Sequence, residues 1–245
     1  MNFKSCFALC TLLLISACSE PLILNPDAVL PDGSRYSGGI VDGRFSGQGK
    51  LVYSGGGYYQ GGFVDGVFHG NGVLVFASGD RWEGNFTEGQ ATGEFTIISS
   101  DTETRYVGGL QNGYMHGKGE LTTQEYVYKG DFVLGDFEGH GVYTHSNGGA
   151  YTGEFEANLY HGHGSVSYEN GSSYTGEFKA GNYHGDGEFK QGDMFYRGTF
   201  VDGVLTGQAE LSMYDGSMYT GEVEAWQPQG EGCLLYTSDA ADEWL

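Results

Sequence analysis

The chain has 245 residues, of which 45 are glycine, 18 are tyrosine and 15 are phenylalanine. Its formal net charge is −21 at pH 7, because 32 acidic residues stand against 11 lysines and arginines. Such an acidic surface repels nucleic acid and anionic lipid headgroups, so composition excludes nucleic-acid binding and disfavours direct headgroup binding.

Residues 1–17 have the pattern of a secretory signal peptide. One positive charge, Lys4, precedes an apolar run from Phe7 to Ile15, and the small residues Ser16 and Ala17 follow. The run is much shorter than the ~20 apolar residues that a transmembrane helix requires. We therefore expect residues 1–17 to direct secretion.

Cys18 follows this segment directly. The sequence Ile15-Ser16-Ala17-Cys18 resembles a bacterial lipobox, in which cleavage leaves the cysteine as a lipid-modified N-terminus. The alternative is an ordinary signal peptide with an incidental cysteine. We expect lipidation of Cys18 to anchor the protein to the bacterial envelope, and Ser19 in place of an aspartate favours the outer membrane.

Residues 18–35 precede the repeated part of the chain. They carry no repeat pattern, and Pro31-Asp32-Gly33-Ser34 is typical of a turn. We expect this segment to be a lipidated tether that ends in an N-terminal cap.

A phrase of about 23 residues is repeated nine times within residues 36–232. Its copies begin at Tyr36, Tyr59, Trp82, Tyr106, Tyr128, Tyr151, Tyr174, Tyr196 and Tyr219. A fixed period of this length indicates stacked supersecondary units. Because the same pattern recurs nine times, the chain lacks the unique arrangement that an active site needs, and we predict that it is not an enzyme.

Each copy alternates apolar and polar residues. With the first aromatic residue as position 1, glycine occupies positions 3 and 12 in all copies, and position 5 is always apolar. Position 8 is usually glycine, and positions 16 and 18 are mostly apolar or aromatic. This pattern predicts two strands joined near position 8, with the odd positions 1–5 and the even positions 10–18 on one face. We expect the glycines of that face to leave room for aromatic rings.

These features predict an all-β fold, an elongated single-layer antiparallel sheet of about nine stacked hairpins that resembles a solenoid rod or trough. A single hairpin is marginal in water, so stability must accumulate along the array.

The repeat resembles the MORN (membrane occupation and recognition nexus) family. Tyr151-Thr-Gly153-Glu-Phe155 with His161-Gly-His-Gly164 matches the family phrase, and the copy from Tyr174 matches equally well. Phe95 and Ala209 depart from it, since both replace the glycine at position 14. The resemblance implies scaffolding, membrane association or partner docking, and it implies no shared catalytic activity.

Histidines and carboxylates also recur at fixed positions, as His161 and His184 do at position 11. Equivalent residues of adjacent repeats should lie two strand spacings apart, about 10 Å. This separation is too wide for shared zinc or calcium ligands. We predict no metal site, no cofactor and no catalytic residues.

The aromatic ladder is the feature with binding potential. The candidate groove-binding residues are Tyr59, Phe68, Phe137, Tyr160 and Tyr183. Rings along a groove would suit a glycan or an apolar peptide, although most rings must also pack on their neighbours to hold the array together.

The last residues, 233–245, look foreign to the repeat. Cys233–Glu243 matches a translation of a widely used transposase sequencing adapter. The alternative is a genuine final strand, because Leu234 and Tyr236 fall at positions 16 and 18. Sequencing the gene across this junction distinguishes the two.

Three functions fit these observations. We favour a non-enzymatic, envelope-anchored scaffold or protein-binding rod that contacts the membrane through the lipid on Cys18. The alternatives are a glycan- or cell-wall-binding module that uses aromatic stacking, and the N-terminal regulatory part of an enzyme whose catalytic domain lies beyond residue 232.

Overall fold

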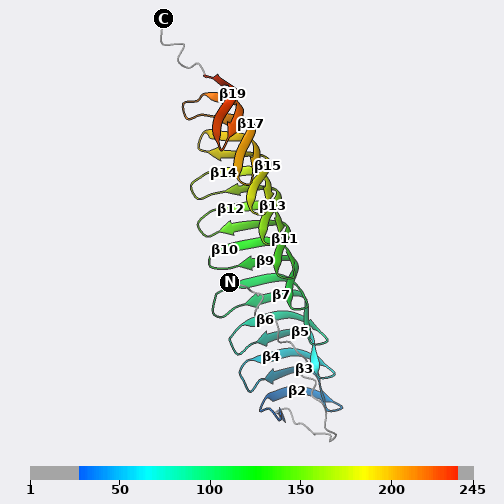
Figure 1. Cartoon of the computed structure of the whole chain (residues 1–245). Coiled ribbons are helices and arrows are strands. Elements are labelled where there is room, and N and C mark those ends of the chain that lie inside the picture. Colours follow the sequence, from blue (N-terminus) through cyan, green and yellow to red (C-terminus); the bar gives the residue numbers. More distant parts are fainter. Residues whose placement is uncertain (1–27, 237–245) are drawn as a thin grey trace. The chain divides into compact units, whose positions relative to one another are not determined.

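The computed structural model describes residues 28–236. It confirms the predicted all-β fold, because these residues form an open antiparallel sheet of 19 strands and contain no helix. The chain divides into two compact units, Met1–Asp136 and Phe137–Leu245. Within each unit the hairpins follow one another in chain order (Figure 1). Across residues 28–236 there is no helix long and apolar enough to cross a membrane.

In the first unit, each strand pairs with the next along the chain. Its strands are β1 (Ala28–Val29), β2 (Arg35–Val41), β3 (Arg44–Val52), β4 (Tyr58–Val64), β5 (Val67–Val75), β6 (Arg81–Thr87), β7 (Gln90–Ile98), β8 (Arg105–Gln111), β9 (Tyr114–Thr122) and β10 (Tyr126–Val133).

In the second unit the same pairing runs from β11, which begins at the unit boundary, to β19. Its strands are β11 (Asp136–His145), β12 (Ala150–Glu156), β13 (Leu159–Ser167), β14 (Ser173–Lys179), β15 (Asn182–Gln191), β16 (Met194–Val201), β17 (Val204–Ser212), β18 (Met218–Glu224) and β19 (Gln227–Leu235).

The turn predicted near position 8 is a two-residue hairpin loop. In the second repeat Val64 pairs with Val67, so only Asp65 and Gly66 form the loop. Both have positive φ, at 50° and 86°. Two central residues with positive φ are the signature of a type I′ turn, whose twist matches the flanking strands. This loop sets the register of the hairpin.

The glycine at position 12 has a different role from the one predicted. In the second repeat Gly61 pairs with Gly72 and Gly62 with His69, so the second strand bulges at Gly70 and Asn71. Gly70 has a φ of 68°, and a Cβ added there would meet nothing within 4 Å. The position therefore needs glycine for its left-handed backbone, not to accommodate an aromatic ring.

The glycines that accommodate the ring are at positions 3 and 14. The ring of Tyr59 lies over Gly61 and Gly72, where any Cβ would overlap its hydroxyl group. That hydroxyl donates a 3.0 Å hydrogen bond to the carbonyl of Gly62. The same bond, from position 1 to the position 4 carbonyl, occurs at Tyr36, Tyr59, Tyr106, Tyr128, Tyr151, Tyr174 and Tyr219.

The position 5 rings join successive repeats. Phe178 packs edge-to-face on Tyr174 of its own repeat and on Tyr151 of the preceding one, with both centroids 5.1 Å away. Phe63 makes the same contacts with Tyr59 and Tyr36. Edge-to-face pairs at this distance are favourable beyond their burial, so a tyrosine such as Tyr59 or Tyr151 is held by its own repeat and by the next.

Two repeats lack glycine at position 14, and their position 1 rings pack differently. Phe95 lies against Gly84 in the third repeat, in the place that tyrosine takes elsewhere. In the eighth repeat the Ala209 methyl and Leu205 crowd Gly198, and Tyr196 instead packs on Phe189 and Trp226.

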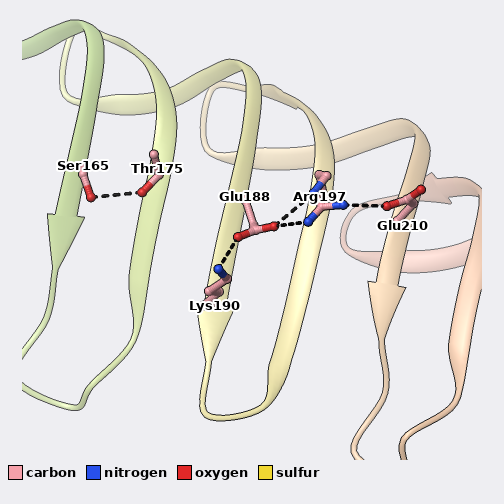
Figure 2. Close-up of polar contacts among 6 residues, drawn as sticks. All are labelled: Ser165, Thr175, Glu188, Lys190, Arg197 and Glu210. Atoms are coloured by element: carbon pink, nitrogen blue, oxygen red, sulfur yellow. Dashed lines mark hydrogen bonds and ion pairs between the residues drawn. The ribbon is translucent and has the colours of Figure 1, made fainter.

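The opposite face is polar, as predicted. Arg197 on β16 bridges Glu188 on β15 and Glu210 on β17, through contacts of 2.5 and 2.9 Å (Figure 2). Lys190 also contacts Glu188, at 2.6 Å, and with Arg197 holds the pKa of that carboxyl below its ordinary value. Exposed ion pairs contribute roughly 0–1 kcal/mol each, so this face adds little to stability.

The structure predicts that Gly72→Ala destabilises the protein. The added methyl overlaps the Tyr59 ring, and overpacking of this kind costs about 1–3 kcal/mol. Urea unfolding followed by circular dichroism measures the change. Gly55→Ala is the control, because a Cβ at Gly55 meets nothing within 4 Å. Equal unfolding midpoints for the two variants would refute the interlock between tyrosine and glycine.

Candidate binding groove

Two of the predicted site residues are not part of the groove described below: one lies outside the described residues and the other is buried. Cys18 falls outside the described residues, so its lipidation stays a prediction. Tyr59 is fully buried, with 0% of its surface exposed. Its inclusion among the groove-binding rings was wrong, because the glycines at positions 3 and 14 let the ring sink onto the backbone.

The other four predicted rings occupy position 10 and are half-buried: Phe68, Phe137, Tyr160 and Tyr183. They cover the position 1 tyrosines, since Phe68 stacks on Tyr59 at 3.7 Å and Tyr160 on Tyr151 at 3.7 Å between centroids. Each such ring is buried on one face by the array.

One groove with a volume of about 490 Å³ opens in the second unit. Its apolar lining comes from the fifth and sixth repeats and includes Phe137, Tyr143, Phe155, Tyr160 and Tyr168. The volume lies within the roughly 300–1,000 Å³ typical of small-ligand sites. The structure thus brings together Phe137 and Tyr160 of the predicted set, with two tyrosines that the prediction omitted.

Turn residues supply the polar part of the lining. The backbone N–H of Asn147 donates to His145 Nδ1 at 3.1 Å, which places the proton of the neutral imidazole on Nε2. Asn147 Oδ1 accepts from the Gly149 N–H at 3.0 Å, which leaves the amide NH2 as the donor of that side chain. Glu169 is the charged acid of the lining, and the lining contains no lysine or arginine.

Tyr160 in the groove and Tyr183 in the next repeat are desolvated. Burial, with smaller contributions from Tyr143 and Tyr168, raises the pKa of Tyr160 to about 12. Burial also raises the pKa of Tyr183, whose hydroxyl lies 2.5 Å from that of Tyr168. These phenols therefore remain protonated near neutral pH and offer hydroxyl groups, not charges, to a ligand.

The recurring histidines and carboxylates do not assemble into a metal cluster. His161 Nδ1 lies 2.9 Å from the Glu156 carboxylate, and His184 Nδ1 lies 3.9 Å from that of Asp202. Throughout residues 28–236, no three His, Cys, Asp or Glu side chains are grouped so that they would hold a metal ion.

The prediction missed Tyr143 and Tyr168 as groove residues. Tyr143 occupies position 16, where most repeats carry an aliphatic residue such as Leu74 or Leu121. The sequence signal that could have identified Tyr143 as a groove residue was a large ring at a position that is usually aliphatic. Whether that ring reaches a groove depends on the bulge geometry, which the alternation alone does not specify.

Fold and groove together define a repeat protein of stacked β-hairpins with a groove lined by aromatic side chains. The MORN repeat model matches residues 36–58, 59–81, 106–124, 128–150, 151–173, 174–194 and 196–218. These matches span more than half of the chain, which therefore belongs to the MORN repeat family. The two copies without a match begin at Trp82, where Phe95 replaces glycine, and at Tyr219, where Trp226 and Pro228 occupy the hairpin.

Comparison with other proteins adds no function. None of the curated proteins matches the chain. Among solved structures, the wild-type TCP10 domain of Danio rerio CPAP is similar, with 10% identity, a TM-score of 0.43, and coverage of 81% of this chain and 97% of that one. The Drosophila melanogaster SAS-4 TCP domain in complex with a proline-rich motif of Ana2 has 12% identity, a TM-score of 0.30, and coverage of 81% and 96%. Scores this low support no argument.

The buried tyrosines predict an alkaline loss of stability. Burial raises the pKa of Tyr59 from 10.0 to about 12. In the unfolded chain the phenol loses its proton near pH 10, so its stabilising contribution is complete below that pH and disappears as the pH approaches 12. We expect the urea midpoint to fall between pH 10 and pH 12.

Two variants identify the source of this fall. Tyr59→Phe should reduce it, whereas Tyr214→Phe should leave it unchanged, because Tyr214 is 93% exposed. A midpoint that stays constant between the two pH values would contradict the assignment.

Proposed function

We propose that this protein is a non-enzymatic scaffold of the bacterial envelope that docks a protein partner in the groove of its second unit. The observation that carries the proposal is a set of partly exposed rings gathered around one groove. The tyrosines at position 1 are consumed by the packing of the array, whereas Tyr143, Tyr160 and Tyr168 remain partly exposed around an open groove. Aromatic side chains with polar tips supply large contact areas at a low entropic cost.

The absence of catalysis belongs to the same proposal. The array places the same side chains at equivalent points of successive repeats, about two strand spacings apart. Catalytic pairs need different environments that separate their pKa values, and a regular ladder gives equivalent environments. The groove lining combines tyrosines, amides, the carboxylate of Glu169 and a histidine whose Nδ1 is already bonded to the backbone.

A glycan is the second candidate for the groove. The rings of Tyr143 and Tyr160 lie with their centroids 6.5 Å apart, and His145 and Asn147 offer hydrogen-bond donors beside them. Sugar rings stack on aromatic faces while their hydroxyl groups take such donors. The test of the docking site must therefore distinguish protein from carbohydrate.

Photocrosslinking in cells tests the docking site. A photoreactive amino acid replaces Leu159, which lines the groove and is 48% exposed, or Val142, which lies at the outward position 15 of the fifth repeat and is 40% exposed. We expect a discrete protein adduct from position 159 and none from position 142.

Each other outcome contradicts the proposal. Equal adducts from both positions would show contact that is not specific to the groove. No protein adduct from position 159, with retention of the purified protein on a cell-wall oligosaccharide resin, would favour the glycan.

Envelope anchoring through the lipid on Cys18 rests on the lipobox-like sequence. We predict that Cys18→Ser moves the protein from the membrane fraction to the soluble fraction, because the acidic surface repels anionic headgroups. Quantitative fractionation with Ser19→Ala as the control measures the shift. If Cys18→Ser stays on membranes at low salt and is released at high salt, the headgroups bind the protein directly and the proposed anchor is wrong.

A further inference from the structure

The second unit contains a side chain that occupies a groove of the same design. Trp226 stands at position 8 of the ninth repeat, in the hairpin loop, and its indole packs back over the eighth. It lies 5.4 Å from Phe200, 5.5 Å from Tyr196 and 5.6 Å from Phe189 between ring centroids. All three contacts are edge-to-face.

Gly181 holds the equivalent place above the open groove. It is position 8 of the seventh repeat, and its N–H donates to the Tyr160 carbonyl at 2.9 Å. The Trp226 N–H makes the same bond to Leu205, the position 10 residue of the repeat before it, at 3.3 Å. The backbone position is the same, but glycine leaves the space beneath it open.

The walls of the two sites also correspond. Phe189 and Phe200 stand at position 16 of the seventh repeat and position 5 of the eighth. Their counterparts beneath Gly181 are Tyr143 and Phe155, both of which line the open groove. The third ring differs in position, because Tyr196 of the filled site is position 1, whereas Tyr160 of the open one is position 10, the counterpart of Leu205.

We infer that the open groove takes an aromatic side chain of the docking partner, held edge-to-face on Tyr143 and Phe155 as the protein's own Trp226 is held. This inference rests on the proposed function and specifies its ligand. A buried aromatic side chain in a central pocket is the usual anchor of a protein interface.

The charges specify the rest of the segment. The lining carries Glu169 but no lysine or arginine, and the whole chain has a net charge of −21. An acidic segment would therefore be repelled, and a neutral or basic one is complementary. The imidazole Nε2–H of His145 and the amide of Asn147 donate, so they suit the backbone carbonyls on either side of the anchor.

The experiment fills the groove with a side chain of the protein itself. Gly181→Trp places an indole where Trp226 shows that the fold accepts one, since Trp226 has a φ of 67° and Gly181 a φ of 84°. Gly89→Trp is the matched control, at position 8 of the third repeat in the first unit, where the N–H donates to the Phe68 carbonyl. The probe is a short lysine-flanked peptide with one central 5-fluorotryptophan, followed by ¹⁹F NMR, which detects only the probe.

We expect the wild-type protein and Gly89→Trp to shift and broaden the fluorine signal, and Gly181→Trp to bind at least about tenfold more weakly, a difference of about 1.4 kcal/mol. A peptide with 5-fluorotryptophan flanked by glutamates should bind more weakly than the lysine-flanked one. Tyr143→Leu is a second variant that preserves the fold, because leucine occupies position 16 in several repeats. It should also weaken binding by removing one wall.

An unchanged fluorine signal with the wild-type protein, or equal binding by Gly181→Trp and the wild type, would overturn the inference. The proposed function is tested separately, by the crosslinked adduct from position 159. If the adduct from position 159 persists in the Gly181→Trp background, the groove still docks a protein, but without an aromatic anchor in this space.

Discussion

The fold depends on one recurring contact, in which a tyrosine ring lies flat on two glycines of its own hairpin and its hydroxyl donates to a backbone carbonyl three residues on. In the second repeat these groups are Tyr59, Gly61, Gly72 and the carbonyl of Gly62. The contact uses glycine as a binding surface, because any Cβ would occupy the volume of the ring. In most repeats a position 5 ring from the next repeat then closes over the tyrosine, as Phe178 does over Tyr151. Each hairpin is thus stabilised by its neighbours, which is how an array without a central core remains folded.

The proposed binding surface consists of the aromatic rings that this packing does not bury. The position 1 tyrosines that lie over two glycines are buried, so they are unable to contact a partner. The rings at positions 10, 16 and 18 lie one layer further out, and in the fifth and sixth repeats they surround a groove. The loop residue above differs between the two sites, since Gly181 leaves that layer accessible and Trp226 fills it. Under the proposed function, binding depends on variation at the outer and loop positions of the repeat, while the inner positions hold the fold.

Much of the fold could be predicted from the sequence, because the strands of a hairpin array pair with their neighbours along the chain. The period located each pair of strands, and glycine at position 8 located the two-residue loop, as Asp65 and Gly66 show. The role of Gly70 was not accessible, since alternation assigns every residue to one of two faces and has no place for a bulge that adds residues to one strand. The burial of Tyr59 was missed for a related reason: the depth of a ring depends on which glycines pair beneath it, and that register follows the bulge. The adapter assignment of residues 233–245 stays a prediction, because Cys233–Leu235 pair with β18 through backbone groups that any sequence offers.

Exchange of the tyrosine hydroxyl protons, observed by NMR, tests the central contact most directly. We expect slow exchange for the position 1 tyrosines whose hydroxyl groups donate to a carbonyl. Each such hydroxyl proton should also give cross-peaks to the α-protons of the glycines beneath it. Tyr214, which is 93% exposed, supplies the rate of an unprotected hydroxyl in the same sample. Hydroxyl protons of Tyr59, Tyr151 and Tyr174 that exchange as fast as that of Tyr214 would contradict the account.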